Sequence, residues 1–213
     1  MRRRGRELFA LVVLLACHAL CLAAPDFAGE SATDDARYTA NWVLEAADNQ
    51  GRPFAIVDKR DARLYVFSAD GRLIGAAAAL LGLTPGDRSE TDITGRAPAS
   101  LGLGERTTPA GRFVSQPGHN DKGEDIVWVD YEASLAIHRL RPAPAYERRP
   151  ERLASPTSDD NRISLGCIVV PVAFYEAVVA PTLGRLRGVV YVLPESRPVQ
   201  AMFGATQFGM NAR

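Results

Sequence analysis

A cysteine and a histidine are the residues whose types and positions could support covalent chemistry. Cys167 lies in the run Ser164-Leu165-Gly166-Cys167-Ile168, where Gly166 leaves space beside the sulfur for an incoming carbonyl. His138 ends the apolar run Leu135-Ala136-Ile137, so it lies at the end of a predicted strand. Thiol acyl transfer needs a thiolate, a base that generates it and donors for the oxyanion. We expect Cys167 to be the nucleophile, His138 the base, and the backbone N–H groups near Gly166 and Cys167 the donors.

Residues 1–23 have the layout of a secretory signal peptide. Arginines at positions 2–4 and 6 precede an apolar run, 8–16, that is too short to span a bilayer, and small residues precede a cleavage site near Ala23. We therefore expect export to the periplasm or cell envelope. An alternative remains open, because Leu14-Leu15-Ala16-Cys17 resembles a lipobox. Lipid on Cys17 would then anchor the protein to a membrane.

After cleavage near Ala23 the chain keeps one cysteine and two histidines. Exported compartments are oxidising and favour paired cysteines, so a single thiol requires a chemical reason. The alternative is a buried cysteine that acts as a small hydrophobic residue. His119, in Pro-Gly-His-Asn-Asp, has the surroundings of a turn residue and is the weaker candidate for the base. So few ligand residues also make a metal site unexpected.

Short apolar runs separated by turns predict a mainly β protein. The hairpin signal is clear where the run 63–67, the turn Asp70-Gly71 and the run 72–81 follow one another. Pro171 is well placed to open a helix that continues to about Ala180. We expect a β-sandwich or open barrel with one main helix after Cys167. The other predicted strands are 54–57, 112–114, 126–129, 135–137, 163–170 and 189–193, and the predicted long loops are 82–108 and 139–162.

The chain divides into four expected segments. These are a signal peptide, 1–23, a linker with a short helix, 24–50, a catalytic domain, 51–195, and a C-terminal tail, 196–213. The short helix is predicted from Tyr38 to Ala47, with Asn41 as a weak cap. Alternation along a strand places Tyr65 and Phe67 on one face and the residues beside them on the other. The residues expected on that other face are Leu64 and Val66, and those expected to pack inward from the later helix are Val172, Tyr175, Val178 and Val179.

In four places the sequence resembles the YkuD-type L,D-transpeptidases. The first is Ala55-Ile56-Val57-Asp58-Lys59, followed by the predicted hairpin at 63–71. The second is Thr108-Pro109-Ala110-Gly111-Arg112-Phe113, and the third is Ala136-Ile137-His138. The fourth is Ser164-Leu165-Gly166-Cys167-Ile168. The motifs occur in the family's order, and the resemblance covers residues 54–194.

This resemblance implies an L,D-transpeptidase fold and a transferase that works without a cofactor. Cys167 would form a thioester with a peptidoglycan tetrapeptide stem and transfer it to an amine of another stem or of a wall-attached protein. His138 would be the general base, and Gly166 and Ser164 would shape the oxyanion hole and the backbone of the motif. Such an enzyme would act in cell-wall biogenesis and cell shape.

Two alternatives stay open, a hydrolase because the sequence does not reveal acceptor access, and an inactive module because of departures from the family motifs. Leu165 replaces the motif histidine, Val169 replaces a polar residue, and Arg139 follows the base where a small residue is common. One alternative is a hydrolase that uses the same Cys167 and His138 on stem peptides. The other is a wall-binding module that has lost activity.

Arginines are frequent between the base and the nucleophile. Stem peptides carry several carboxylates, which suit the arginine fork, so we expect Arg139 and Arg162, which flank the catalytic segments, to bind substrate. The alternative is a solvated loop, since Glu147 and Glu151 are interleaved with the arginines. The formal net charge is zero, and nothing indicates nucleic acid as a partner.

Overall fold

The computed structural model describes residues 25–88, 100 and 102–204 and is mainly β, as predicted. The expected signal peptide and Cys17 lie outside these residues. No helix in the described part of the chain is long and apolar enough to cross a membrane. The strands are β1 Phe54–Asp58, β2 Arg63–Phe67, β3 Leu73–Ala78, β4 Leu81–Gly82, β5 Gly111–Val114, β6 Gln116–His119, β7 Asp125–Asp130, β8 Leu135–Arg139, β9 Arg162–Ser164, β10 Ile168–Val170 and β11 Val189–Val192. The helices are α1 Asp34–Glu45, α2 Arg149–Ala154, α3 Val172–Phe174, the π-helical turn Tyr175–Val179 and α4 Ala180–Thr182, with 3-10 turns η2 Leu103–Glu105, η3 Ala145–Glu147, η4 Ser158–Asn161 and η6 Val199–Ala201.

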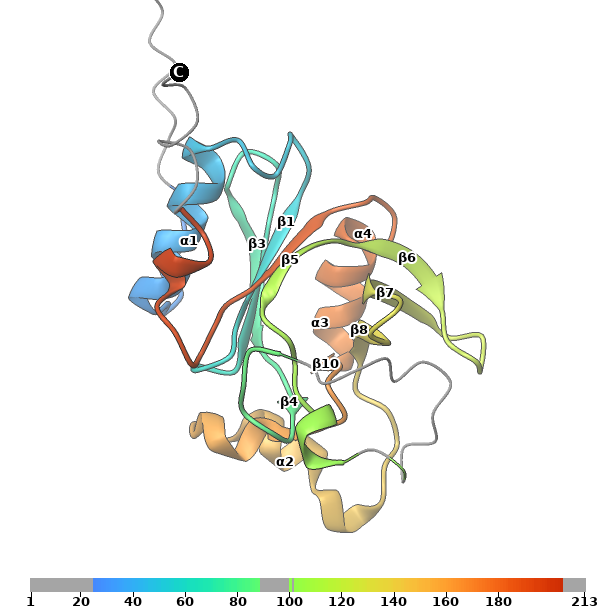
Figure 1. The fold of residues 1–213 in the computed structure, drawn as a ribbon. Coiled ribbons are helices and arrows are strands. Elements are labelled where there is room, and N and C mark those ends of the chain that lie inside the picture. The colour runs from blue at the N-terminus through green and yellow to red at the C-terminus, as the bar shows by residue number, and fades with distance from the viewer. Residues whose placement is uncertain (1–24, 89–99, 101, 205–213) are drawn as a thin grey trace, which may run out of the picture.

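Two mixed sheets form the framework of the fold (Figure 1). The larger sheet has the order β3-β2-β1-β11-β5, and the smaller has the order β10-β8-β7-β6. Each contains one parallel pair, β1 with β11 and β10 with β8, while their other neighbours are antiparallel. The strands β8 and β10 are adjacent in the sheet but far apart in the chain. The long segment between them is the crossover connection that a parallel pair needs.

The central strands of the larger sheet, β1, β2 and β11, are buried on both faces, and β2 shows the alternation that the sequence predicts. Leu64 and Val66 belong to the core between the two sheets, whereas Tyr65 and Phe67 belong to a second core under α1. Both faces of β2 are apolar because each face packs against a different hydrophobic core. The first core also takes Val127, Ile137 and Ile168 from the smaller sheet and Tyr175, Val179 and Leu183 from the helical segment after Pro171.

The helical segment after Pro171 confirms the predicted helix but not all of its inward face. Tyr175 and Val179 are buried, and Val178 packs partly against the core. Val172 is 41% exposed, so its predicted inward position was wrong. It lies in the first turn, where side chains point back past the start of the helix.

The segments flanking the predicted domain also pack on it. The helix α1 begins at Asp34, not at Tyr38, because the Thr33 hydroxyl accepts the Ala36 N–H at 3.1 Å and caps it. Phe27, in the expected linker, is buried and makes edge contacts with the aromatic rings of β2. In the expected tail, Phe203 is buried as well.

Two details of strand structure differ from the prediction. The expected single strand 163–170 is two strands, β9 and β10, since Gly166 between them has a φ of +132° and breaks the extended backbone. His119, expected in a turn, is the last residue of β6. Pro117 and Gly118 precede it in the same strand. A proline is tolerated in β6 because this strand lies at the edge of its sheet.

Candidate functional site

The parallel pairing of β8 with β10 brings His138 and Cys167 to one face of the smaller sheet. Val169 pairs with His138, and Ile168 pairs with Ile137. Ile137 and Ile168 point into the core, so by alternation His138, Val169 and Cys167 share the opposite face. Diagonal neighbours on paired strands are about 7–8 Å apart at Cα, within reach of each other's side chains.

The Cys167 thiol is held at the start of β8. It donates to the Ser134 carbonyl oxygen at 3.4 Å and is a free cysteine. Burial raises the pKa of the thiol, and a hydrogen bond with the Ala136 backbone and the charge of Arg141 offset this in part. Among the described residues no hydrogen bond joins the thiol to His138, so proton transfer requires a rotation of one of the two side chains. Catalytic hydrogen bonds often form only when substrate is bound.

The surroundings of His138 fix the tautomer of its ring and keep it neutral. Its Nδ1 lies 2.8 Å from the Arg139 carbonyl oxygen, which can only accept, so Nδ1 carries the proton and Nε2 keeps its lone pair. Burial lowers the pKa of His138 to about 4, a shift that the hydrogen bond with Arg139 opposes and the charges of Arg141 and Arg149 increase. The imidazole is therefore neutral at pH 7 and able to accept the thiol proton.

The loop before Cys167 is held by Ser164. The Ser164 hydroxyl accepts the Gly166 N–H at 3.1 Å and donates to the Cys167 carbonyl oxygen at 2.6 Å. Ser164 is buried, so it sets the backbone of this loop from the inside. The Gly166 N–H is thus occupied, and the Cys167 N–H is the donor in this loop that Ser164 does not use.

The two arginines that sequence favours for substrate already have partners. Arg139 lies 3.5 Å from Glu176 and over the ring of Tyr175. Arg162 pairs with Glu195 at 2.6 Å and donates to the Lys59 carbonyl at 2.8 Å. Substrate binding by these arginines stays a prediction. Arg162 would have to exchange Glu195 for a substrate carboxylate at a mostly buried position.

Arg141 is a further substrate-binding candidate that the structure adds to Arg139 and Arg162. Its charge acts on both His138 and Cys167, and it lines a pocket of about 300 Å³ with Arg148 and Arg149. Glu124 pairs with it at 2.8 Å. The only sequence signal was its position three residues after His138, which does not distinguish it from its neighbours.

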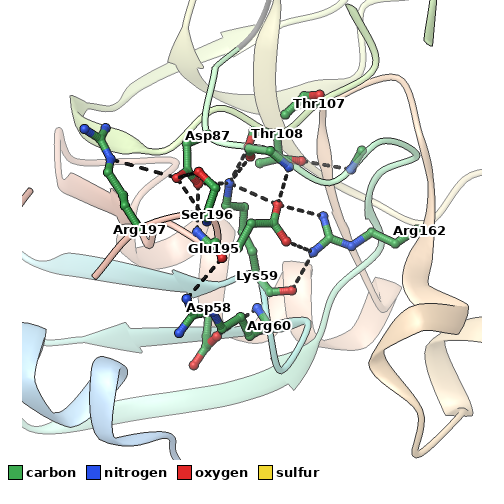
Figure 2. Close-up of polar contacts among 12 residues, drawn as sticks. Asp58, Lys59, Arg60, Asp87, Thr107, Thr108, Arg162, Glu195, Ser196 and Arg197 are labelled. Atoms are coloured by element: carbon green, nitrogen blue, oxygen red, sulfur yellow. Dashed lines mark hydrogen bonds and ion pairs between the residues drawn. The ribbon is translucent and has the colours of Figure 1, made fainter. Parts of the chain in front are cut away.

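Four charged side chains with little or no exposed surface form a group that we call the charge cluster: Lys59, Asp87, Arg162 and Glu195 (Figure 2). The Lys59 ammonium lies 3.1 Å from Asp87 and 3.3 Å from Glu195, and its side chain has no exposed surface. Burial lowers the pKa of Lys59, and the two carboxylates oppose that shift. Two cations and two anions balance, which is how buried charges are tolerated.

The departures from the family motifs lie in buried or half-buried positions. Val169 is buried, and its backbone pairs with Leu80 on one side and with His138 on the other. Leu165 is half-buried. Position 169 is thus part of the interior here, and valine fits it without an unpaired polar group.

His119 lies far from Cys167. Three strand spacings separate β6 from β10, roughly 14 Å. Its ring pairs with Asp125 at 3.0 Å and is mostly exposed. Of the two histidines in the described part of the chain, His138 is the one on the face that Cys167 occupies.

No protein-family model and no curated protein matches the chain. Among solved structures it is similar to the L,D-transpeptidase of Xylanimonas cellulosilytica, with 18% identity over 70% of this chain and 67% of that one and a TM-score of 0.40. It is similar to the catalytic domain of the E. faecium L,D-transpeptidase, with 17% identity over 67% of this chain and 98% of that one and a TM-score of 0.37. It is also similar to the helical cell shape determining protein Pgp2 of Campylobacter jejuni, with 13% identity over 75% of this chain and 56% of that one and a TM-score of 0.40. At these identities the similarities assign no activity to the chain.

Proposed function

We propose that the chain is an exported L,D-transpeptidase that uses Cys167 as nucleophile and His138 as base on peptidoglycan stem peptides. The observation that supports the proposal is the pairing of β8 with β10, from which strand alternation puts His138 and the free Cys167, just before β10, on one face of the smaller sheet. The motifs around Thr108, His138 and Cys167, which resemble those of that family, support the substrate class.

The chemistry proceeds in two acyl transfers. The thiol proton of Cys167 passes to Nε2 of His138 as the sulfur attacks the carbonyl carbon of the stem, and an S–C bond forms. The C–N bond then breaks, and the leaving amine takes the proton from the imidazolium. The nitrogen of an acceptor amine then attacks the thioester carbon, so that a new C–N bond forms and the S–C bond breaks. The proton that the amine loses passes through His138 to the sulfur and restores the thiol. The acceptor is a second stem or a wall-attached protein.

Substrate carboxylates are held by the arginines beside the site. Arg141 is the first candidate, because its charge reaches both reacting groups. Arg139 lies next to His138 in the chain and is 28% exposed at its side chain, so it contributes at the rim. An arginine fork can bind a carboxylate through two parallel hydrogen bonds.

The test is incubation of the chain from residue 24 with defined muropeptides, followed by mass spectrometry of the products. A cross-linked dimer and released D-alanine are expected, and Cys167→Ala should yield neither. Loss of D-alanine without a cross-link would identify a hydrolase instead. No product and no thioester on Cys167 would overturn both and favour a wall-binding module.

Export is tested separately, by N-terminal sequencing of protein recovered from the cell envelope. A terminus near Ala24 is expected, whereas a lipid-modified Cys17 at the terminus would establish a lipoprotein.

A further inference from the structure

Thr108 holds the peptide bond that joins Gly166 to Cys167. The Thr108 hydroxyl donates to the Gly166 carbonyl oxygen at 2.7 Å and accepts the Gly82 N–H at 2.9 Å. Thr108 has no exposed surface, so water does not compete for these bonds. A trans peptide places its C=O and N–H on opposite sides. A Gly166 carbonyl that points at Thr108 therefore turns the Cys167 N–H away from it.

Gly166 also lies close to the residue before Thr108. Its φ is +132°, and a Cβ at this position would lie 3.0 Å from the Thr107 carbonyl oxygen. Only glycine combines this backbone conformation with so close an approach to the segment 107–108. Ser164 occupies the Gly166 N–H, so orientation of the peptide decides where the Cys167 N–H points.

Lys59 holds Thr108 in turn. Its ammonium donates to the Thr108 carbonyl oxygen at 3.1 Å and is fixed by the carboxylates of Asp87 and Glu195 (Figure 2). A shift of the Thr108 backbone would remove a hydrogen bond from a buried cation, which is costly. The charge cluster therefore acts as a rigid support for Thr108.

We infer that Thr108 is a positioning residue, supported by Lys59, that orients the Gly166–Cys167 peptide so that the Cys167 N–H stabilises the oxyanion formed during acylation. The inference rests on the proposed function in taking Cys167 as the acylated residue and His138 as the group that accepts its proton. When the sulfur attacks, its proton passes to His138, the S–C bond forms and the carbonyl oxygen takes the negative charge until the leaving group departs with the electrons of its bond. A donor that is oriented beforehand needs no reorganisation at that moment.

Two reactions of the same sulfur separate this role from a purely structural one. Acetylation by p-nitrophenyl acetate develops an oxyanion, whereas alkylation by iodoacetamide displaces iodide and develops none. Thr108→Val keeps the shape but removes the hydroxyl. It should slow acetylation by about 10²–10³-fold, the effect of losing an oxyanion donor, with alkylation near the wild-type rate. Thr108→Ser should restore acetylation, because it keeps the hydroxyl.

Thr39→Val is the matched control. Thr39 is also fully buried and donates one hydrogen bond, to the Asp35 carbonyl oxygen at 2.8 Å, but it lies in α1 on the far face of the larger sheet. Both rates should stay at the wild-type value. A Thr108→Val protein that is acetylated at the wild-type rate, or that loses both reactions together, would overturn the inference, as would a wild-type Cys167 that is alkylated but never acetylated.

The two proposals fail separately, because p-nitrophenyl acetate needs no stem recognition. A wild-type protein that is inactive on muropeptides but shows the Thr108-dependent difference refutes the transpeptidase proposal alone. If Thr108→Val does not fold, a crystal structure of the acetylated wild type decides. Its thioester oxygen should lie within hydrogen-bond distance of the Cys167 nitrogen, and an oxygen turned elsewhere would overturn the inference.

Discussion

At the scale of single residues, the neutrality of His138 sets the pH range of the reaction. Burial lowers its pKa to about 4 from the ordinary 6.5, and a base must be unprotonated to accept the thiol proton. The acylation rate should therefore fall only below about pH 4–5, rather than below the ordinary histidine pKa. The measurement is the second-order rate constant for acylation between pH 3.5 and 8. An acid limb centred at the ordinary value would show that the imidazole is solvated before it reacts.

A second prediction at this scale concerns the loss of His138, the proposed base. His138→Gln keeps a polar side chain of similar size but cannot accept the proton, so acylation should slow by roughly 10²–10⁴-fold. His119→Gln is the control, since His119 lies on the edge strand β6 and pairs only with Asp125. Acylation rates of both variants, measured at pH 7 by mass spectrometry, check the assignment. Equal effects at the two positions would contradict it.

At the scale of elements, α1 owes its start to Thr33. The Thr33 hydroxyl caps the helix through the Ala36 N–H and donates to an Asp58 carboxylate at the end of β1, so it joins two elements. Thr33→Ala should lower the free energy of unfolding by about 1–2 kcal/mol. Thr33→Ser keeps both contacts and should be close to wild type. Urea unfolding at pH 7 measures the difference, and an Ala variant as stable as wild type would show that the cap contributes nothing.

The elements also show how far the sequence could predict this fold. Apolar runs and alternation predicted β1, β2, β7, β8 and the two faces of β2, because those signals are local. The break between β9 and β10 was missed because the positive φ of Gly166 accompanies a close approach to Thr107 and Thr108, which lie far away in the chain. Phe27 and Phe203 stand among small and polar residues, so nothing local marks them as buried. The outer face of the larger sheet buries them, and that face exists only in the folded chain.

For the candidate site, the sequence indicated the residue types but not their arrangement in space. Cys167 and His138 were recognisable by type and by motif, but their common face follows from a parallel pairing that sequence does not reveal. The charge cluster draws Lys59, Asp87, Arg162 and Glu195 from four distant segments. No spacing rule links them, and Arg162 taken alone suggested a role in substrate binding.

At the scale of the whole molecule, the charge cluster links stability to pH. Burial would raise the pKa of Asp87. Hydrogen bonds from the Ser196 hydroxyl, the Glu195 backbone N–H and the Lys59 ammonium outweigh this effect and lower the pKa to about 2 from the ordinary 3.8. A lowered acid pKa contributes stability above the unfolded value, and that stability is lost as the pH falls from about 4 towards 2. The contribution is about 2 kcal/mol at pH 7.

Asp87→Asn should therefore lower the free energy of unfolding at pH 7 by at least about 2 kcal/mol, because it also leaves Lys59 with one carboxylate fewer. The difference from wild type should shrink at pH 3. Asp121→Asn, at an exposed position, is the control and should change little at either pH. Urea unfolding at both pH values gives the four comparisons. A difference that is the same at pH 3 and pH 7 would contradict the linkage.

The crossover between β8 and β10 has a consequence for how such a protein can diversify. The proposed nucleophile and base belong to two adjacent strand segments, whereas residues 140–161 leave the sheet and return to it, and α2 packs mainly on the η4 turn of the same segment. Residues 140–160 are exposed or half-buried, so this part of the crossover can vary without entering the pairing of β8 with β10. Exchange of the crossover would replace the arginines beside the site, and because Arg141 and Arg149 lower the pKa of His138, it would also shift the pH range in which the imidazole is neutral. Substrate preference and pH range would therefore evolve together, while the thiol and the imidazole keep their places in the sheet.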